Sequence, residues 1–260
     1  MIHIINTLNI KQQQLREGTY HTGSGPDIVL IMGSCRAVPY LNYLNHWNLT
    51  NGNKFTLHFI DPFNWNWDAK DNRVDYEKEL AKQQSNPKLL KVLKSTSVFV
   101  HEYYNNAGMF NVSVGPGNIY SYGLTPTLDI TLPNYNDVFV LTREIVSFDT
   151  EVRKEAIQDY NVIGKLSEQT LEHIAQVREA NLDKFYQVCL KTDFPEFKEI
   201  FQEGYKHKRF FLTFNHVAKE FTLTLFRMMN EKFLKLPLTE TFWEEISEHD
   251  MYGSIFIPLS

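Results

Sequence analysis

The most informative run in the sequence is Asp27-Ile28-Val29-Leu30-Ile31-Met32-Gly33-Ser34-Cys35-Arg36. After Asp27 the run is apolar without alternation up to Gly33, as expected for a central strand buried on both faces. From Arg36 to Trp47 the apolar residues keep roughly helical spacing. We therefore expect a buried strand, a turn at Gly33-Ser34-Cys35 and a helix, which places Cys35 at or near a helix N-terminus.

Other short runs in the N-terminal half are rich in β-branched and aromatic residues. They cover residues 55–60, 97–103 and 138–141, and helical or loop stretches separate them. This spacing is typical of βαβ units. It predicts an α/β fold with a mainly parallel sheet flanked by helices, of the three-layer kind seen in SGNH-like or Rossmann-like proteins.

The pattern changes beyond about residue 147. Apolar residues between Leu171 and Cys189, and again between Ala218 and Met228, fall on one face of a helix. We expect one α/β domain over residues 1–260, with a sheet-rich part at 1–147 and a mainly helical part at 148–260. The stretch Asn111 to Asn136 is rich in Gly, Pro and Asn and is expected to be a long ordered loop.

Composition excludes several classes of protein. The 260 residues are 43% hydrophobic and 22% charged, which is ordinary for a globular protein and unlike a disordered, collagen-like or coiled-coil chain. The formal charge is −5, with 31 acidic residues against 26 basic ones. We therefore expect no nucleic-acid binding through broad phosphate neutralisation.

The number of cysteines and the length of the apolar runs indicate in which cellular compartment the protein is expected. Cys35 and Cys189 are the two cysteines, too few for a disulfide framework or a thiolate zinc site. The first residues lack the basic start and apolar core of a secretory signal, and no run approaches the roughly 18 apolar residues of a membrane span. We expect a cytoplasmic protein without a membrane span. No metal is expected, because no two histidines share the close helical spacing of a zinc site.

The turn around Cys35 has the features of a nucleophile turn. Gly33 allows a sharp bend, the helix dipole favours a thiolate at Cys35, and backbone N–H groups of the turn could hold an oxyanion. In open α/β sheets, ligands bind beyond the carboxyl ends of the strands. The alternative is that Cys35 is a small buried hydrophobic residue and Gly33 only a tight turn.

A histidine near the C-terminal helices is the candidate base. The run Phe210 to Phe214 ends at Asn215-His216, just before a helix expected to begin near Val217. Asn215 would then be the N-cap. The positive end of the helix dipole would keep His216 neutral near pH 7. The alternative is a histidine whose ring caps a backbone group.

These two elements together resemble a known family. Ile31-Met32-Gly33-Ser34-Cys35-Arg36 and Thr213-Phe214-Asn215-His216 are similar to motifs of WcbI-type capsule-polysaccharide biosynthesis proteins, a family of acyltransferases that bind coenzyme A. The family carries a Gly-Asn-Cys-Gln-like turn and an Asn-His-Pro-like element. This chain departs from it at Ser34, Arg36 and Val217.

The resemblance implies roles for named residues. Cys35 and His216 would be the paired reactive residues, and Gly33, Ser34, Arg36 and Asn215 would shape or line the coenzyme A site. Coenzyme A or an acyl thioester would be the acyl donor and a saccharide the acceptor. Arg36 could pair with a phosphate or carboxylate, which suits a more anionic ligand. Its alternative is a surface residue in a first helical turn.

Two acidic residues at expected strand ends complete the candidate site. Asp61 follows the run 55–60, and Glu102 lies in the run 97–103. Either could orient His216 or bind a substrate hydroxyl. The alternatives are that Asp61 is a turn residue before Pro62 and that Glu102 is the partner of a buried Tyr or Arg.

The leading hypothesis is thus an acyltransferase with Cys35 and His216 at the reacting centre. Cys35 could attack the acyl group itself, or His216 could deprotonate the acceptor while Cys35 only lines the site. A second hypothesis is an SGNH-like esterase whose nucleophile is Ser34. A third is a glycan- or partner-binding protein that keeps the α/β scaffold without catalysis.

Overall fold

The computed structural model describes residues 3–61, 87–103, 128–133, 150–204, 207–208, 210 and 217–249. By its contacts the chain divides into two compact units, Met1–Leu132 with Thr222–Ser260, and Pro133–Phe221. The expectation of a single domain over 1–260 stays a prediction.

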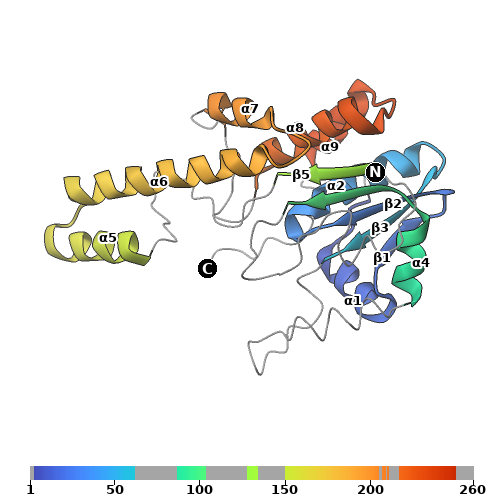
Figure 1. The fold of residues 1–260 in the computed structure, drawn as a ribbon, viewed down its shortest axis with the longest axis horizontal. Helices are drawn as coiled ribbons and strands as arrows, with labels where there is room; N and C mark the ends of the chain where they lie inside the picture. The colour runs from blue at the N-terminus through green and yellow to red at the C-terminus, as the bar shows by residue number, and fades with distance from the viewer. Residues whose placement is uncertain are drawn as a thin grey trace. The chain divides into compact units, whose positions relative to one another are not determined.

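The first unit holds every strand of the described chain (Figure 1). In chain order its elements are α1 (Thr7–Glu17), β1 (Tyr20–Gly23), β2 (Asp27–Met32), the 3₁₀ turn η1 (Cys35–Ala37), α2 (Val38–Thr50), β3 (Phe55–Ile60), α4 (Pro87–Ser95), β4 (Thr96–Glu102), β5 (Leu128–Leu132), most of α8 (Lys219–Met229), the π-helical turn η2 (Asn230–Leu234) and α9 (Glu240–Glu248). The strand, turn and helix expected around Cys35 are confirmed.

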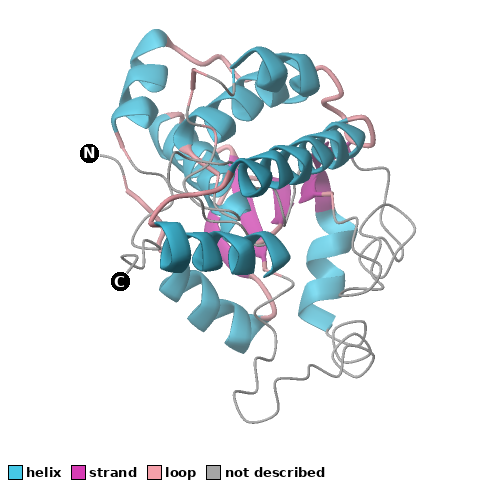
Figure 2. Ribbon diagram, turned by 90° about the vertical axis from the view of Figure 1, so that its left-hand side faces the viewer, coloured by secondary structure: helices cyan, strands magenta, loops and turns pink. Residues whose placement is uncertain are grey.

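The strands form one sheet in the order β1-β3-β2-β4-β5, which Figure 2 shows in magenta. β1 runs antiparallel to β3, and the other neighbouring pairs are parallel. The predicted α/β class with a mainly parallel sheet flanked by helices is confirmed. Residues 138–141, expected as a strand, lie outside the described residues.

Two short edge strands were not predicted. β5 lies inside the stretch expected to be a loop, so that expectation is wrong for Leu128–Leu132. β1 has only four residues and contains a glycine. Both strands are too short for their periodicity to stand out, and they form because a neighbouring strand supplies hydrogen bonds.

The two faces of the sheet are covered by different helices. Leu30, Met32 and Phe99 pack on one face against Leu89 and Leu93 of α4. The opposite face carries the alternate residues of β2 and β3, and there Trp47 of α2 lies 5.5 Å, between ring centroids, from Phe55. Because β2 is covered on both faces, its unbroken apolar run is accounted for.

The second unit is helical in its described part, as expected for this region. It contains α5 (Thr150–Ile163), α6 (Glu168–Cys189), α7 (Phe197–Gly204) and the first turn of α8. Aromatic rings form its core, with centroids 4.8 Å apart between Phe185 and Phe201 and between Phe197 and Phe221. Across both units, no helix that the structure describes has the length and apolar character to cross a membrane.

Buried amide side chains hold loops of the first unit in place. Gln14 bonds both the backbone N–H and the carbonyl of Asp61, each at 2.9 Å. Asn48 does the same for Phe55, at 2.8 and 2.9 Å. An amide carries both a donor and an acceptor, so one side chain can bond both backbone groups of a residue at the end of a strand.

Gly33 allows the turn after β2 to approach β4 closely. A Cβ atom at this position would overlap the Cβ of Ala37 and would lie 3.0 Å from two side-chain carbons of Glu102. The backbone N–H of Gly33 donates to the carbonyl of Ile60 at 3.0 Å. The missing side chain, rather than an unusual backbone angle, is therefore what this position requires.

We expect Gly33→Ala to lower the free energy of unfolding by about 2 kcal/mol, because overpacking of a close contact costs about this much. Urea denaturation of the purified protein measures it. The matched variant Gly33→Ala/Ala37→Gly removes the overlapping Cβ, and we expect it to be more stable than the sum of the two single changes predicts. Additive effects would contradict the close-contact explanation.

Candidate functional site

The candidate site lies where the chain changes direction across the sheet. β3 lies on one side of β2 and β4 on the other, so the chain runs from β2 to β3 in one direction and from β3 back across β2 to β4 in the other. Ligands of open α/β sheets bind at such a switch point, beyond the carboxyl ends of the strands. Met32 pairs with Ile60 on one side and with His101 on the other. The next residues, Gly33, Asp61 and Glu102, therefore meet at one edge, as the sequence analysis expected.

The hydroxyl of Ser34 connects the turn to β4. Its Oγ donates to Glu102 Oε2 at 3.2 Å and accepts from the Arg36 backbone N–H at 3.3 Å and from Arg36 Nε at 3.0 Å. The Ser34 backbone N–H also donates to Glu102 Oε2, at 3.2 Å. A hydroxyl has one proton and two lone pairs, so these bonds use its full capacity.

Arg36 is buried beside Glu102. Its residue is 7% exposed, and its Nε lies 3.7 Å from Glu102 Oε1. The alternative of a surface residue in a first helical turn is wrong, and Glu102 does have the buried Arg partner considered for it. Because the carboxylate balances the guanidinium charge, Arg36 brings little net positive charge to the edge of the sheet.

Cys35 is partly exposed, and its environment disfavours the thiolate. Burial raises the pKa of the thiol above its ordinary value; Arg36 lowers it, whereas the charges of Glu102 and Asp61 raise it further. A short 3₁₀ turn supplies less dipole than a long helix, and here burial outweighs it. The direction of this pKa shift is opposite to the one expected for a turn that favours a thiolate.

The turn amides are mostly in use. Besides the Ser34 and Gly33 amides, the Arg36 N–H bonds Ser34 Oγ, and the Ala37 N–H bonds the Ser34 carbonyl at 2.9 Å. An oxyanion hole needs donors aimed at the reacting oxygen. These four amides do not offer that without rearrangement of the turn.

Asp61 belongs to the same edge, and its backbone is held by Gln14 of α1. The residue is 8% exposed, and its charge reaches the Cys35 thiol. Gln14 was not among the residues singled out from the sequence, because nothing in the sequence links a helical glutamine to a strand end 47 residues later.

Tyr40 is a second site residue that the sequence analysis missed. Burial raises its pKa well above the ordinary value, and the charges of Tyr43 and Glu102 add to this effect. Tyr40 lies four residues after Arg36, in the first turn of α2. That spacing is the signal that could have identified it.

Asn215 and His216 lie outside the described residues, so their pairing with Cys35 stays a prediction. The N-cap role expected for Asn215 is wrong, because α8 begins only at Lys219. The backbone N–H of Ala218, the residue before α8, donates to the Phe210 carbonyl at 2.7 Å. His216 is accordingly not in the first turn of α8, and the helix-dipole argument for its neutral state does not apply.

Comparisons with known proteins do not assign the chain. It matches no protein-family model, no curated protein and no solved structure. The resemblance to WcbI-type proteins therefore stays a prediction. In the part of the chain that the structure describes, no three His, Cys, Asp or Glu side chains are grouped as metal ligands.

We expect Cys35 to react slowly with iodoacetamide at neutral pH and to speed up only above the ordinary thiol value of about 8.5. Asp61→Asn removes a negative charge that disfavours the thiolate, so its rate profile should move to lower pH. The rate constant against pH, followed by mass spectrometry, measures both. Cys189→Ser is the control, since Cys189 is fully buried with a pKa raised to about 12. A wild-type midpoint well below 8.5 would contradict this account.

We expect Glu102→Gln to cost about 3 kcal/mol of unfolding free energy, because it leaves the Arg36 charge buried without its partner. Arg36→Met should cost a similar amount by leaving Glu102 unbalanced. The double variant should lose much less than the sum, which urea denaturation would show. Independent, additive losses would mean that the two groups do not form a functional ion pair.

Proposed function

We propose that the protein transfers an acyl group from coenzyme A or another acyl thioester to a saccharide hydroxyl, with Cys35 at the reacting centre. One observation carries the proposal: Cys35 lies at the switch point of the sheet, beside Asp61 and next to the half-buried Ser34 and the buried pair Arg36 and Glu102. This is where open α/β sheets bind their ligands. An SGNH-like arrangement of the sheet and its helices and a cytoplasmic location are part of the same proposal.

The contacts favour Cys35 over Ser34 as the nucleophile. The Ser34 proton is donated to Glu102, and both of its lone pairs accept bonds from Arg36. Attack by Ser34 would break this network. The thiol of Cys35 is partly exposed and is the more nucleophilic group once deprotonated. The esterase hypothesis based on Ser34 therefore has less support.

The proposed chemistry has two steps. The Cys35 thiol gives up its proton to a base, and the sulfur attacks the thioester carbonyl. The new carbon–sulfur bond forms as the bond to coenzyme A breaks, and the departing thiolate takes up a proton. A saccharide hydroxyl then attacks the acyl-cysteine and loses its proton, and the Cys35 thiol is restored.

A base is essential in this scheme, because the pKa of Cys35 is raised by burial and by the neighbouring carboxylates. The resemblance assigns this role to His216. The same raised pKa also suits the variant mechanism, in which His216 deprotonates the acceptor directly and Cys35 only lines the site. The neutralised Arg36 leaves the phosphates of coenzyme A to be bound by other residues.

Intact-mass analysis after incubation with acetyl-coenzyme A tests the proposal. We expect the mass of one acetyl group to be added, and peptide mapping to place it on Cys35. The Cys189→Ser variant should keep this product, and Cys35→Ser should lack it. Adding a saccharide acceptor should discharge the acetyl group as an ester.

The remaining outcomes separate the alternatives. If Cys35→Ser still turns over acetyl-coenzyme A and no acetylated protein forms, the acceptor attacks the thioester directly. Covalent catalysis by Cys35 would then be wrong. If no acyl thioester acetylates the protein or is turned over, the acyl-transfer proposal is contradicted. The hypothesis of a non-catalytic binding protein would then remain.

A further inference from the structure

A pocket in the first unit lies at the opposite end of α2 from the candidate site. Its volume is about 300 Å³, and it is lined by Trp47, Thr50, Asn51, Pro237, Thr239, Thr241, Phe242 and Glu245. α2 begins next to Cys35 and has 13 residues, so its two ends are about 20 Å apart. This pocket is therefore separate from the switch point.

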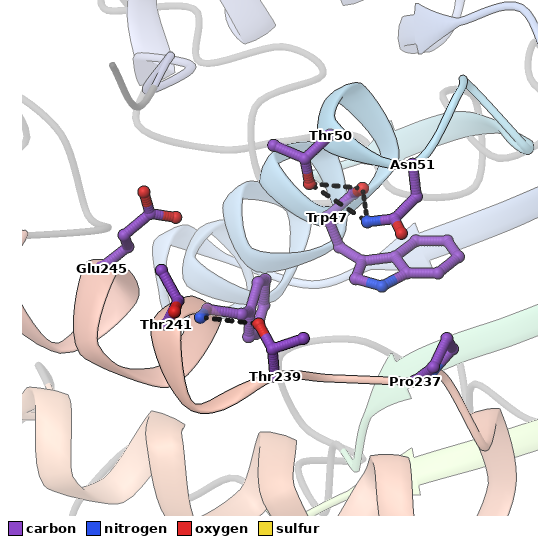
Figure 3. Close-up of a pocket in the computed structure, with 8 residues that line it drawn as sticks. Trp47, Thr50, Asn51, Pro237, Thr239, Thr241 and Glu245 are labelled. Atoms are coloured by element: carbon purple, nitrogen blue, oxygen red, sulfur yellow. Dashed lines mark hydrogen bonds between the residues drawn. The ribbon is translucent and has the colours of Figure 1, made fainter.

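The pocket has an aromatic floor and a polar rim (Figure 3). Trp47 and Phe242 are buried, at 2% and 6% exposure, whereas Thr50, Asn51 and Thr241 are exposed. No lysine or arginine is among the described residues that line it. An aromatic surface beside hydroxyl, amide and carboxylate groups suits a ligand with both C–H faces and hydroxyls.

The indole N–H of Trp47 is a buried donor without an acceptor among the residues that the structure describes. Buried polar groups nearly always have a partner, so this one requires an explanation. Figure 3 shows the indole nitrogen on the ring edge turned toward the Pro237 and Thr239 side of the pocket. Because this nitrogen is enclosed, a ligand acceptor bonds it only after side chains on the Pro237 and Thr239 side turn aside, while the backbone there stays in place.

Acceptors and donors for ligand hydroxyls are present on the rim as well. Glu245 Oε2 bonds His46 Nε2 at 2.7 Å, which leaves Oε1 to accept from a ligand. Asn51 uses its amide nitrogen on the Trp47 carbonyl and on Thr50, which leaves its oxygen to accept. The Thr241 hydroxyl can do either.

Hydrogen bonds within the protein hold the backbone of the rim, so binding requires movement of side chains only. Thr239 caps α9 by accepting from the Phe242 N–H at 3.2 Å. Asn230 bonds the N–H and the carbonyl of Leu236, at 2.8 and 3.1 Å, and so holds the segment that leads to Pro237. A site whose rim is already ordered loses little entropy on binding.

From these features we infer that this pocket binds one neutral sugar ring, seated on Trp47 and Phe242 and hydrogen-bonded by Glu245, Asn51, Thr241 and the Trp47 indole. Its volume is at the small end for ligand pockets, which suits a single ring better than a nucleotide. The one carboxylate that lines the pocket disfavours an anionic ligand, and Lys54, whose Nζ lies over the Trp47 ring at 5.5 Å from its centroid, is not among the lining residues. The inference does not depend on acyl transfer at Cys35.

NMR titration of the Trp47 indole N–H tests this directly. The full-length protein is titrated with methyl α-D-glucopyranoside, methyl α-D-mannopyranoside and methyl β-D-galactopyranoside, with glucose 6-phosphate as the charged counterpart. Trp47→Phe assigns the indole signal. We expect a saturable movement of that signal with at least one neutral sugar, and weaker binding of the phosphate.

Substitutions of side chains on the rim test the site with little effect on folding. Glu245→Gln and Thr241→Ala should each weaken sugar binding by about threefold to tenfold, the effect of one hydrogen bond. Cys35→Ser should bind as wild type does, which separates this site from the proposed active site. No saturable movement with any neutral sugar, preference for the phosphate, or unchanged affinity in both rim variants would each overturn the inference.

Discussion

The close approach of the turn after β2 to the end of β4 is the contact on which the candidate site depends. Gly33 has no side chain to keep the two apart, and the Ser34 hydroxyl then fits between Glu102 and Arg36. With these three polar groups satisfied by one another, an ion pair can be buried at the edge of the sheet at a tolerable cost in desolvation. The direction of α2, and with it the position of Cys35, follows from this arrangement.

This contact also limits the chemistry. Arg36 is committed to Glu102, so it does not provide a free positive charge for an anionic ligand. The nearby carboxylates and burial raise the pKa of Cys35, so the thiol is not activated in advance. In the proposed reaction, Cys35 would therefore need a base and a bound substrate that excludes the surrounding water.

The sequence predicted those features of the fold that follow from a single local pattern of residues. The unalternated apolar run of β2 predicted a central strand, and the carboxyl ends of parallel strands predicted that Asp61 and Glu102 would lie near the turn. Pairings between distant residues could not be predicted, as for Gln14 with Asp61, because no local pattern encodes them. The thiolate expected at Cys35 failed because the dipole argument is local, whereas burial depends on the whole fold. The helix expected near Val217 begins at Lys219, and these two residues are enough to remove Asn215 from the N-cap position.

Hydrogen-exchange mass spectrometry with and without coenzyme A tests the central claim most directly, because it locates the ligand without requiring turnover. The account predicts slower exchange on ligand binding in the peptides that contain Gly33 to Ala37 and the ends of β3 and β4. The Cys35→Ser variant should show the same protection, since binding precedes chemistry. Protection confined to other segments, or none at saturating coenzyme A, would contradict a ligand site at the switch point of the sheet.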